Sequence, residues 1–427
     1  MTLLFNTLRE EFDAKLKNGP VFLRRHIHFE PLPNKISVFI GMRRTGKTTY
    51  VFQCIQSLLA QQVLSSQILY VNFEDDRLLS QDHSLMVELI DSFYSTHPEN
   101  HLQRCYLFFD EIQNVPNWPL VIRRLFDSKN VQICLTGSSA KLLSKEIASS
   151  LRGRAYAKEI WPFDFQEYLE ANKTPLAPIP WGKMQFDVAS QALQQYLQYG
   201  GFPEVVYYRH DVQNRILQEY VNLVVMRDIV ERYKISNISF IKYFIKTLMR
   251  NVGSPFSLHK FFNDAKSQGF SLAKSTVYEY LTYLEDAYLL FTVPLFSESL
   301  RKVQTNPKKI YAIDPGLVNA YTFSLLKNSG HLFENIVFLD LKRKEHEMFY
   351  YVTKEGFEID FLTRDQNGNM HLWQVAWDVE NEATLLRETR ALESAKKELG
   401  IEGTLITPEW YLTHPSITPP SAPSDLQ

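Results

Sequence analysis

The chain has 427 residues, of which 45% are hydrophobic and 22% are charged, a composition typical of a globular protein with about three folded units. Its 46 Lys and Arg residues nearly balance its 48 Asp and Glu residues, so the formal net charge is −2. This balance excludes a protein that is basic over its whole surface, but it allows a local basic face.

The sequence also argues against membrane-spanning and secreted classes. Its longest apolar stretch, residues 287–296, is about half as long as a bilayer crossing requires. Charged side chains begin at Arg9, which is not the pattern of a signal peptide. Cys54, Cys105 and Cys134 are too widely spaced for a disulfide framework or a cysteine zinc site. We therefore expect a cytoplasmic protein that does not enter a membrane.

Residues 1–163 predict a layered α/β domain. Short apolar runs alternate there with amphipathic stretches, which is the pattern of a parallel sheet covered by helices. The runs are Ile36–Ile40, Ile68–Phe73, Cys105–Phe109, Val131–Leu135 and, more weakly, Ala157–Pro162. Because these runs are apolar on both faces, they predict five strands buried in the middle of the domain.

The remainder of the chain predicts three further units and a tail. Residues 164–234 have a helical pattern, and residues 235–309 predict three helices followed by a hairpin. The second pattern is that of a winged helix-turn-helix with a basic, turn-rich wing at 301–309, although a small helical bundle beside a hairpin would look similar. Residues 310–410 predict an α-β-β-β-α unit. The proline-rich residues 411–427 predict a disordered tail.

A phosphate-binding loop follows the first predicted strand and precedes a helix. It matches G-x-x-x-x-G-K-[ST] and, with the next residue, consists of Gly41, Met42, Arg43, Arg44, Thr45, Gly46, Lys47, Thr48 and Thr49. Backbone N–H groups of such a loop bind phosphate oxygens, and the positive end of the helix dipole assists them. We expect Lys47 to neutralise the β- and γ-phosphates of ATP and Thr48 to ligate Mg²⁺. A chance glycine-rich turn is the alternative, and Arg43 and Arg44 could contact phosphate, contact a carboxylate or be solvated.

The third apolar run ends in two carboxylates, Asp110 and Glu111, which is the Walker B arrangement. We expect Asp110 to hold Mg²⁺ and Glu111 to polarise the attacking water. An acidic pair that merely caps a helix is the alternative, and the loop about 60 residues upstream argues against it.

The fourth run ends in Thr136 and Ser138, either of which could sense the γ-phosphate. A turn that caps a helix at residues 140–143 is an alternative that does not exclude such a sensor. Arg152 and Arg154 follow in a loop where oligomeric ATPases keep an arginine that enters a neighbouring subunit's site. Ordinary surface arginines are the alternative. Arg227 is a second candidate, for which a salt bridge within its own helix or between domains is the stronger interpretation.

These motifs resemble those of a prokaryotic AAA-type ATPase family that joins a P-loop domain, through a winged helix, to a C-terminal domain similar to restriction endonucleases. The resemblance covers most of the chain. It is carried by Gly41–Thr49, Tyr70–Asp75, Phe109–Gln113 with Trp118, Thr136–Ser139, Gly153-Arg154 before Trp161–Phe163, Gly200–Glu204 and Arg227–Val230. The resemblance implies a five-stranded core with a helical lid, the use of ATP and Mg²⁺, and assembly into oligomers.

Two features bear on nucleic acid. Residues 227–309 hold 13 Lys or Arg against 7 Asp or Glu, and Lys274 and Arg301 lie in the predicted recognition helix and wing. This favours DNA contact, although winged helices in ATPases also serve only for domain packing. In the last unit, Glu334 and Asp360 occupy a nuclease-like order. Nucleases of that fold need a second carboxylate and a lysine, but Gln374 and Ala376 stand there instead, so metal-dependent cleavage is not expected.

The sequence thus predicts an ATP-hydrolysing, Mg²⁺-dependent oligomeric switch or motor that acts on DNA through its winged helix and an inactive nuclease-like domain. The main alternative is a nucleotide-dependent switch that binds a protein partner and no nucleic acid. A third hypothesis, an active nuclease, requires Mg²⁺-dependent cleavage that depends on Asp360.

Overall fold

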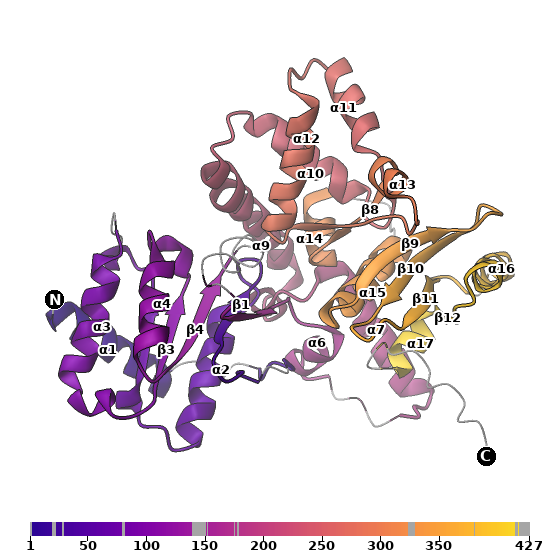
Figure 1. Cartoon of the computed structure of the whole chain (residues 1–427). Coiled ribbons are helices and arrows are strands. Elements are labelled where there is room, and N and C mark those ends of the chain that lie inside the picture. The colour runs from indigo at the N-terminus through magenta and orange to yellow at the C-terminus, as the bar shows by residue number, and fades with distance from the viewer. Residues whose placement is uncertain are drawn as a thin grey trace. The chain divides into compact units, whose positions relative to one another are not determined.

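A computed structural model describes residues 2–18, 23–27, 30–78, 82–138, 151, 153–174, 176, 179–322, 329–379, 381–414 and 417 (Figure 1). The chain divides into two compact units, Met1–Trp161 and Pro162–Gln427. Within the described part of the chain, no helix has both the length and the apolar character that a membrane crossing requires.

The first unit is built on a parallel sheet of five strands in the order β2-β3-β4-β1-β5. The strands are β1 (Ile36–Ile40), β2 (Ile68–Asn72), β3 (Cys105–Asp110), β4 (Val131–Gly137) and β5 (Ala155–Glu159). The predicted α/β fold with a five-stranded parallel sheet is therefore confirmed. Because all strands run the same way, the residues that follow β1, β3 and β4 gather at one edge of the sheet, where open α/β folds bind ligands.

Helices pack against this sheet through a continuous apolar core. They are α1 (Thr2–Asn18), α2 (Lys47–Ala60), α3 (Ser84–Thr96) and α4 (Trp118–Ser128), with the short 3₁₀ helices η1 (Ser65–Gln67), η2 (Asp76–Leu78), η3 (Pro98–His101) and η4 (Ile112–Asn114). Phe12 of α1 and Ile55 of α2 meet Phe39 and Phe108 of the strands in one buried cluster. Close packing of this kind holds the strand ends, and the side chains they carry, in fixed positions.

The second unit begins with helices and a small antiparallel sheet. Its first part comprises α6 (Phe165–Ala171), α7 (Lys183–Tyr199), α8 (Pro203–Val206), α9 (His210–Leu223), the π-helix η6 (Val224–Glu231), α10 (Ile238–Arg250), β6 (Pro255–Phe256), α11 (Leu258–Ser267), α12 (Lys274–Asp286), β7 (Leu290–Val293), α13 (Leu300–Thr305), β8 (Lys308–Ala312) and α14 (Pro315–Thr322). The three strands pair in the order β6-β8-β7.

The rest of the second unit is a four-stranded sheet with helices. It comprises α15 (Ser329–Arg343), β9 (Glu347–Val352), β10 (Glu358–Arg364), β11 (Met370–Val375), α16 (Glu382–Leu399), β12 (Gly403–Ile406) and α17 (Pro408–Thr413), with the strand order β12-β11-β10-β9. The two sheets of this unit are joined by a bridge between Leu295 and Tyr350, and the Tyr350 hydroxyl donates to the Pro307 carbonyl at 2.7 Å.

Several predicted boundaries are wrong. The boundary between 309 and 310 falls inside β8, whose backbone pairs with β7 through Ala312. The predicted wing contains α13, because the Ser299 hydroxyl caps a helix there. The tail cannot begin at 411, since Tyr411 and Leu412 are buried in α17; residues 418–427 lie outside the described residues. The fifth strand is Ala155–Glu159, which begins two residues and ends three residues earlier than predicted, in register with β1.

A turn in the second unit gives a stability prediction. Gly200 has φ 75° and ψ −171°, a conformation that is nearly restricted to glycine, and a Cβ there would lie 1.9 Å from the Asp314 carboxylate. That carboxylate accepts the Gly201 N–H at 2.6 Å, and burial raises its pKa to about 6. We expect Gly200→Ala to reduce the free energy of unfolding by about 3 kcal/mol or more, as measured by chemical denaturation.

Gly269→Ala is the matched control for this change. Gly269 also has a positive φ, of 91°, but nothing lies within 4 Å of an added Cβ. Its loss should therefore be only the conformational cost, about 1 kcal/mol. Equal losses for the two variants would contradict the claim that Asp314 blocks any side chain at position 200.

Candidate functional site

The loop after β1 has the backbone of an anion-binding loop. Gly41 has φ 151° and a Cβ there would lie 2.2 Å from the Ile160 carbonyl oxygen, so only glycine fits. Gly46 has φ 93° and caps α2, which begins at Lys47. The helix N-terminus with its unpaired N–H groups therefore opens directly onto the loop, as phosphate binding requires.

Lys47 lies inside this loop and is turned back onto it. Its side chain is buried, and its ammonium donates to the carbonyl oxygens of Gly41 at 3.0 Å and Met42 at 3.1 Å. The same ammonium lies 3.6 Å from Oε1 of Glu111. The positive charge is thus held at the mouth of the loop, between the backbone that would wrap a phosphate and the acid that follows β3.

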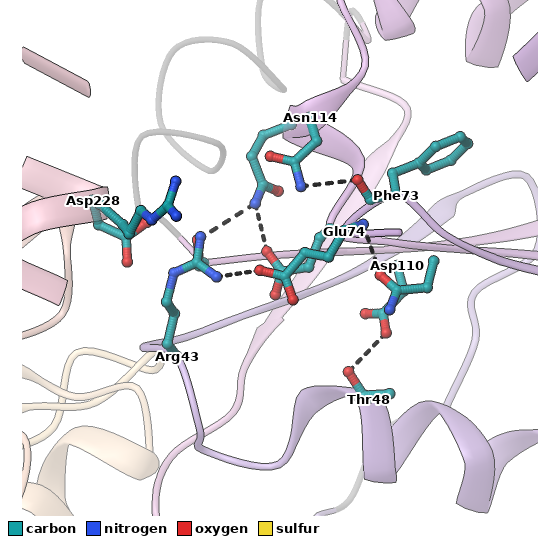
Figure 2. Close-up of polar contacts among 12 residues, drawn as sticks. Arg43, Thr48, Phe73, Glu74, Asp110, Asn114 and Asp228 are labelled. Carbon is teal, nitrogen blue, oxygen red and sulfur yellow. Dashed lines mark hydrogen bonds and ion pairs between the residues drawn. The ribbon is translucent and has the colours of Figure 1, made fainter. Parts of the chain in front are cut away.

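The other loop residues are held by neighbours that the sequence did not single out. The Thr45 hydroxyl donates to the Met42 carbonyl at 2.9 Å, and the Thr45 carbonyl accepts from the buried Arg25 guanidinium at 2.9 Å. Arg43 pairs with Glu74 (Figure 2), which is the carboxylate contact left open by the sequence. Arg44 and Thr48 are exposed, and Thr49 is half-buried.

Asp110, at the end of β3, accepts hydrogen bonds from three hydroxyls. The Thr48 hydroxyl donates to Oδ2 at 2.7 Å (Figure 2), and the Tyr70 hydroxyl of β2 donates to the same oxygen at 3.0 Å. The Thr136 hydroxyl of β4 donates to Oδ1. The two residues predicted to share a magnesium ion are therefore already in contact, and neighbouring strands fix the carboxylate from both sides.

Glu111 is oriented by a separate set of contacts. Its backbone is in the left-handed region, with φ 52°, and its N–H donates to the Thr136 hydroxyl at 2.9 Å. Its carboxylate accepts from the Gln113 amide and faces Lys47. The Gln113 amide also lies 3.4 Å from the Ser138 hydroxyl, so Ser138 is linked to Glu111 through one side chain.

The pKa values of the two acids shift in opposite directions. Burial, reinforced by the Glu111 charge, raises the pKa of Asp110 above its ordinary value despite the three hydroxyl donors. Burial also acts to raise the pKa of Glu111, but the Lys47 charge and the Gln113 hydrogen bond outweigh it and hold the pKa below its ordinary value. Adjacent carboxylates whose pKa values are pushed apart are typical of sites where each has a different role.

The candidate sensor and arginine residues have different placements. Thr136 already donates to Asp110 and accepts from the Glu111 backbone, whereas Ser138 is buried at the tip of β4.

Arg154 precedes β5 at the opposite edge of the sheet from the loop and pairs with Asp127 at 3.1 Å. Arg152 and the predicted helix at 140–143 lie outside the described residues.

Arg227 and the C-terminal candidates lie in the second unit. Arg227 pairs with Glu231 one helical turn away at 3.3 Å, as its alternative interpretation predicted. Glu334 and Asp360 come together, and Lys309 of β8 reaches both of them from outside the motif, in which Ala376 stands at the lysine position. Lys309 is therefore not part of a basic wing surface.

Tyr70, Gln113 and Lys309 contact the predicted site residues but are not predicted as site residues from the sequence. A signal was available for Tyr70, since a tyrosine two residues before the end of an otherwise apolar strand carries a hydroxyl that needs a partner. Lys309 had no such signal, because nothing in its local pattern distinguishes it from the other basic residues around it.

Comparison with protein families assigns the loop and both acids to one domain. Residues 33–169 match the family described as AAA domain. Residues 190–329 and 329–411 match two domains of unknown function, DUF8612 and DUF4143. The first match supports a P-loop ATPase type, and the other two assign no activity.

Similar whole proteins exist in archaea and bacteria. The chain is 36% identical over 389 residues to the uncharacterized protein MJ1544 of Methanocaldococcus jannaschii, covering 89% of this chain and 83% of that one. It is 29% identical to an uncharacterized protein of Haemophilus influenzae, covering 84% and 86%. Among solved structures, the Walker-type ATPase PABY2304 of Pyrococcus abyssi matches with a TM-score of 0.45 and 15% identity, covering 72% of this chain and 99% of that chain.

Proposed function

The chain belongs to one family with the uncharacterized protein MJ1544 and carries an AAA domain of the P-loop ATPase type, and from this premise we propose that it binds and hydrolyses ATP with Mg²⁺. The observation that carries the proposal is the paired arrangement at the end of β3. Asp110 touches the Thr48 hydroxyl, while Glu111 beside it is held in a charged form by Lys47. These are the two separate tasks, metal holding and water activation, that hydrolysis needs.

The residues of this chain fit a nucleotide with its metal ion. The N–H groups of the loop and of the first turn of α2 would bind phosphate oxygens, and Lys47 would exchange the Gly41 and Met42 carbonyls for phosphate. Thr48 and Asp110 would hold Mg²⁺, which neutralises charge on the phosphates when bound. Ser138 would sense the terminal phosphate and pass its position to Glu111 through Gln113.

Glu111 would act as general base. A carboxylate with a lowered pKa is ionised at neutral pH and is therefore ready to accept a proton from water. Before nucleotide binds, the Glu111 carboxylate forms an ion pair with the Lys47 ammonium, which is the group expected to bind phosphate. Binding of a phosphate to Lys47 would weaken that pair and release the carboxylate.

Calorimetry with purified protein tests this proposal. ATP added in the presence of Mg²⁺ should release heat with one binding event per chain, and phosphate release should follow. Absence of heat with ATP and with GTP would remove the basis of every role assigned above.

We further propose that the protein acts as a cytoplasmic oligomeric switch or motor. Arg154 lies at the opposite edge of the sheet from the phosphate-binding loop of the same chain, where it could enter the site of a neighbouring subunit. The side chain of its partner Asp127 is exposed, so this ion pair could break on assembly. Arg152 in the same loop is the second candidate. An arginine supplied in this way is worth about 10³–10⁵ in rate in other nucleotide hydrolases.

The second unit would couple hydrolysis to DNA. The order α10, β6, α11, α12, β7, α13, β8, with the sheet order β6-β8-β7, supports a winged helix at 235–312 whose wing includes α13. Lys274 at the start of α12 and Arg301 and Lys302 in α13 are exposed and would contact phosphates. The α15-to-α17 segment supports an inactive nuclease-like domain.

A nucleotide-dependent switch that binds a protein partner and does not bind DNA is the second candidate function. DNA binding titrated with salt, with and without ATP, separates the two. Contact through exposed lysines and arginines should weaken steeply as salt rises. No binding at low salt in either nucleotide state would favour the protein-binding switch.

A further prediction concerns Tyr70. Tyr70→Phe removes one hydroxyl donor from ionised Asp110, so the already raised pKa of Asp110 should rise further. Because the ionised form holds the metal, ATPase activity should be lost at a higher pH than in the unchanged protein as pH falls. Tyr106→Phe on β3, where the ring lies near Arg104, is the control and should leave the pH profile unmoved. Identical profiles for Tyr70→Phe and the unchanged protein would contradict the role.

A further inference from the structure

A buried lysine fills the acidic cluster of the second unit. Lys309 of β8 has 1% of its side chain exposed. Its ammonium lies 3.0 Å from Oε1 of Glu334 on α15, 2.8 Å from Oε1 of Glu358 and 2.8 Å from Oδ1 of Asp360, both on β10. An ammonium has three N–H donors, so each carboxylate can take one and none is left over.

Two further donors hold Glu334 and Asp360 in the cluster. The Tyr311 hydroxyl donates to Oε1 of Glu334 at 2.6 Å, and the Val375 backbone N–H donates to Oδ2 of Asp360 at 2.9 Å. Gln374 does not face the ammonium, because its carbonyl accepts from the Asp360 N–H and its amide donates to Glu388. Glu334 and Asp360 are therefore each held by a donor besides the lysine, and with Glu358, whose side chain is 39% exposed, they converge on a single point.

Three carboxylate oxygens converging on one point are the ligand set of a hard divalent cation. Here that point is a nitrogen, and its distances of 2.8–3.0 Å are those of ammonium hydrogen bonds rather than of metal bonds, which are about 2.0–2.6 Å. The metal expected from a nuclease-like order of residues does not fit this cluster, since the lysine already occupies the space and satisfies the acids.

We propose that the Lys309 ammonium stands where a divalent cation would lie among Glu334, Glu358 and Asp360, making this cluster a cation site closed by the chain itself. The lysine supplies one positive charge where a metal would supply two, and it cannot exchange with solvent ions. It also ties β8 of the three-stranded sheet to α15 and β10, so both parts of the second unit share one buried ionic centre. The inference is independent of ATP hydrolysis.

Removing the lysine should open the site. Lys309→Ala leaves three converging carboxylates without a counter-ion, and an uncompensated buried charge strongly favours uptake of a cation. We expect this variant to bind one Mn²⁺ per chain, without nucleotide, with a dissociation constant of about 0.1–1 mM as for weak oxygen-ligand sites, and to gain thermal stability from it. Lys309→Ala with Asp360→Asn should lose this binding.

Electron paramagnetic resonance of Mn²⁺ and thermal unfolding of the full chain measure both effects. Lys308→Ala is the matched control, since the neighbouring lysine is only half-buried, and it should take up no more Mn²⁺ than the unchanged protein. A folded Lys309→Ala protein that takes up no extra Mn²⁺ overturns the proposal. A variant that stays unfolded even with Mn²⁺ overturns it as well, because the lysine would then not be replaceable by a metal.

The unchanged protein gives a test that needs no variant of Lys309. It should show no Mn²⁺ binding that depends on Glu334, so Glu334→Gln should leave its Mn²⁺ titration unaltered. A Mn²⁺ site in the unchanged protein that disappears in Glu334→Gln would show that a metal and the lysine coexist there, and the proposal would fail.

Discussion

Glu111→Gln is expected to leave ATP binding intact and to slow hydrolysis about 10²–10⁴-fold, the usual contribution of a general base. An amide cannot accept the proton of the attacking water, but it keeps the size of the side chain, and its oxygen can still accept from the Gln113 amide. Removing the neighbouring charge also removes one cause of the raised pKa of Asp110, so the metal ligand should ionise more easily. Single-turnover phosphate release measures the rate of hydrolysis, and calorimetry with ATP measures nucleotide binding.

Glu88→Gln is the matched control, because Glu88 is an exposed acid on α3 outside the site. It should change neither binding nor turnover. Normal turnover in Glu111→Gln would exclude Glu111 as the base, and loss of ATP binding would instead mean that its pair with Lys47 organises the loop.

The sheet and the loop could be predicted because their signals are local. Strands β1 to β4 are largely apolar runs bounded by polar residues, and the glycines of the loop are required by backbone angles that the motif itself implies. The acids Asp110 and Glu111 were found in the same way, as polar residues at the end of a buried strand. Such features depend on residues within a few positions of one another.

The partners of those acids could not be predicted, because they depend on strand order. Tyr70 and Thr136 reach Asp110 only because β3 lies between β2 and β4, and the sequence does not give that order. Nothing in the sequence pattern of β2 or β4 indicates that these two hydroxyls contact Asp110. Thr136 and Ser138 are therefore equal candidates for a phosphate sensor in the sequence, whereas in the structure the Thr136 hydroxyl donates to Asp110 and accepts from the Glu111 backbone.

Lys309 is the extreme case of this limit. Its three partners lie on α15 and β10, 25 to 51 residues later in the chain, and belong to a unit that the predicted boundary separated from it. A boundary drawn at 309 followed the change from a basic, turn-rich stretch to an apolar one. Tertiary contacts override such a change in composition. The backbone of β8 pairs within the three-stranded sheet, while the Lys309 side chain contacts residues of α15 and β10.

Lys47→Ala is expected to have the largest effect on nucleotide affinity. The ammonium would make charge-assisted hydrogen bonds to two phosphates, each worth about 1.5–3 kcal/mol, so ATP should bind about 10²–10⁴-fold more weakly. The variant also loses the buried hydrogen bonds from Lys47 to the Gly41 and Met42 carbonyls, so thermal unfolding is measured beside ATP binding to separate a loss of stability from a loss of affinity. Calorimetry with ATP and Mg²⁺ measures the loss.

Lys35→Ala separates this effect from a general loss of positive charge. Lys35 precedes the same strand and donates to the Gly153 carbonyl, yet it lies at the other end of β1 from the loop. Its replacement should leave ATP affinity unchanged. Removing the Lys47 charge should also raise the pKa of Glu111, since that charge is the main cause that lowers it. Unchanged ATP affinity in Lys47→Ala would contradict the phosphate-binding role of the loop, whatever the outcome for Glu111.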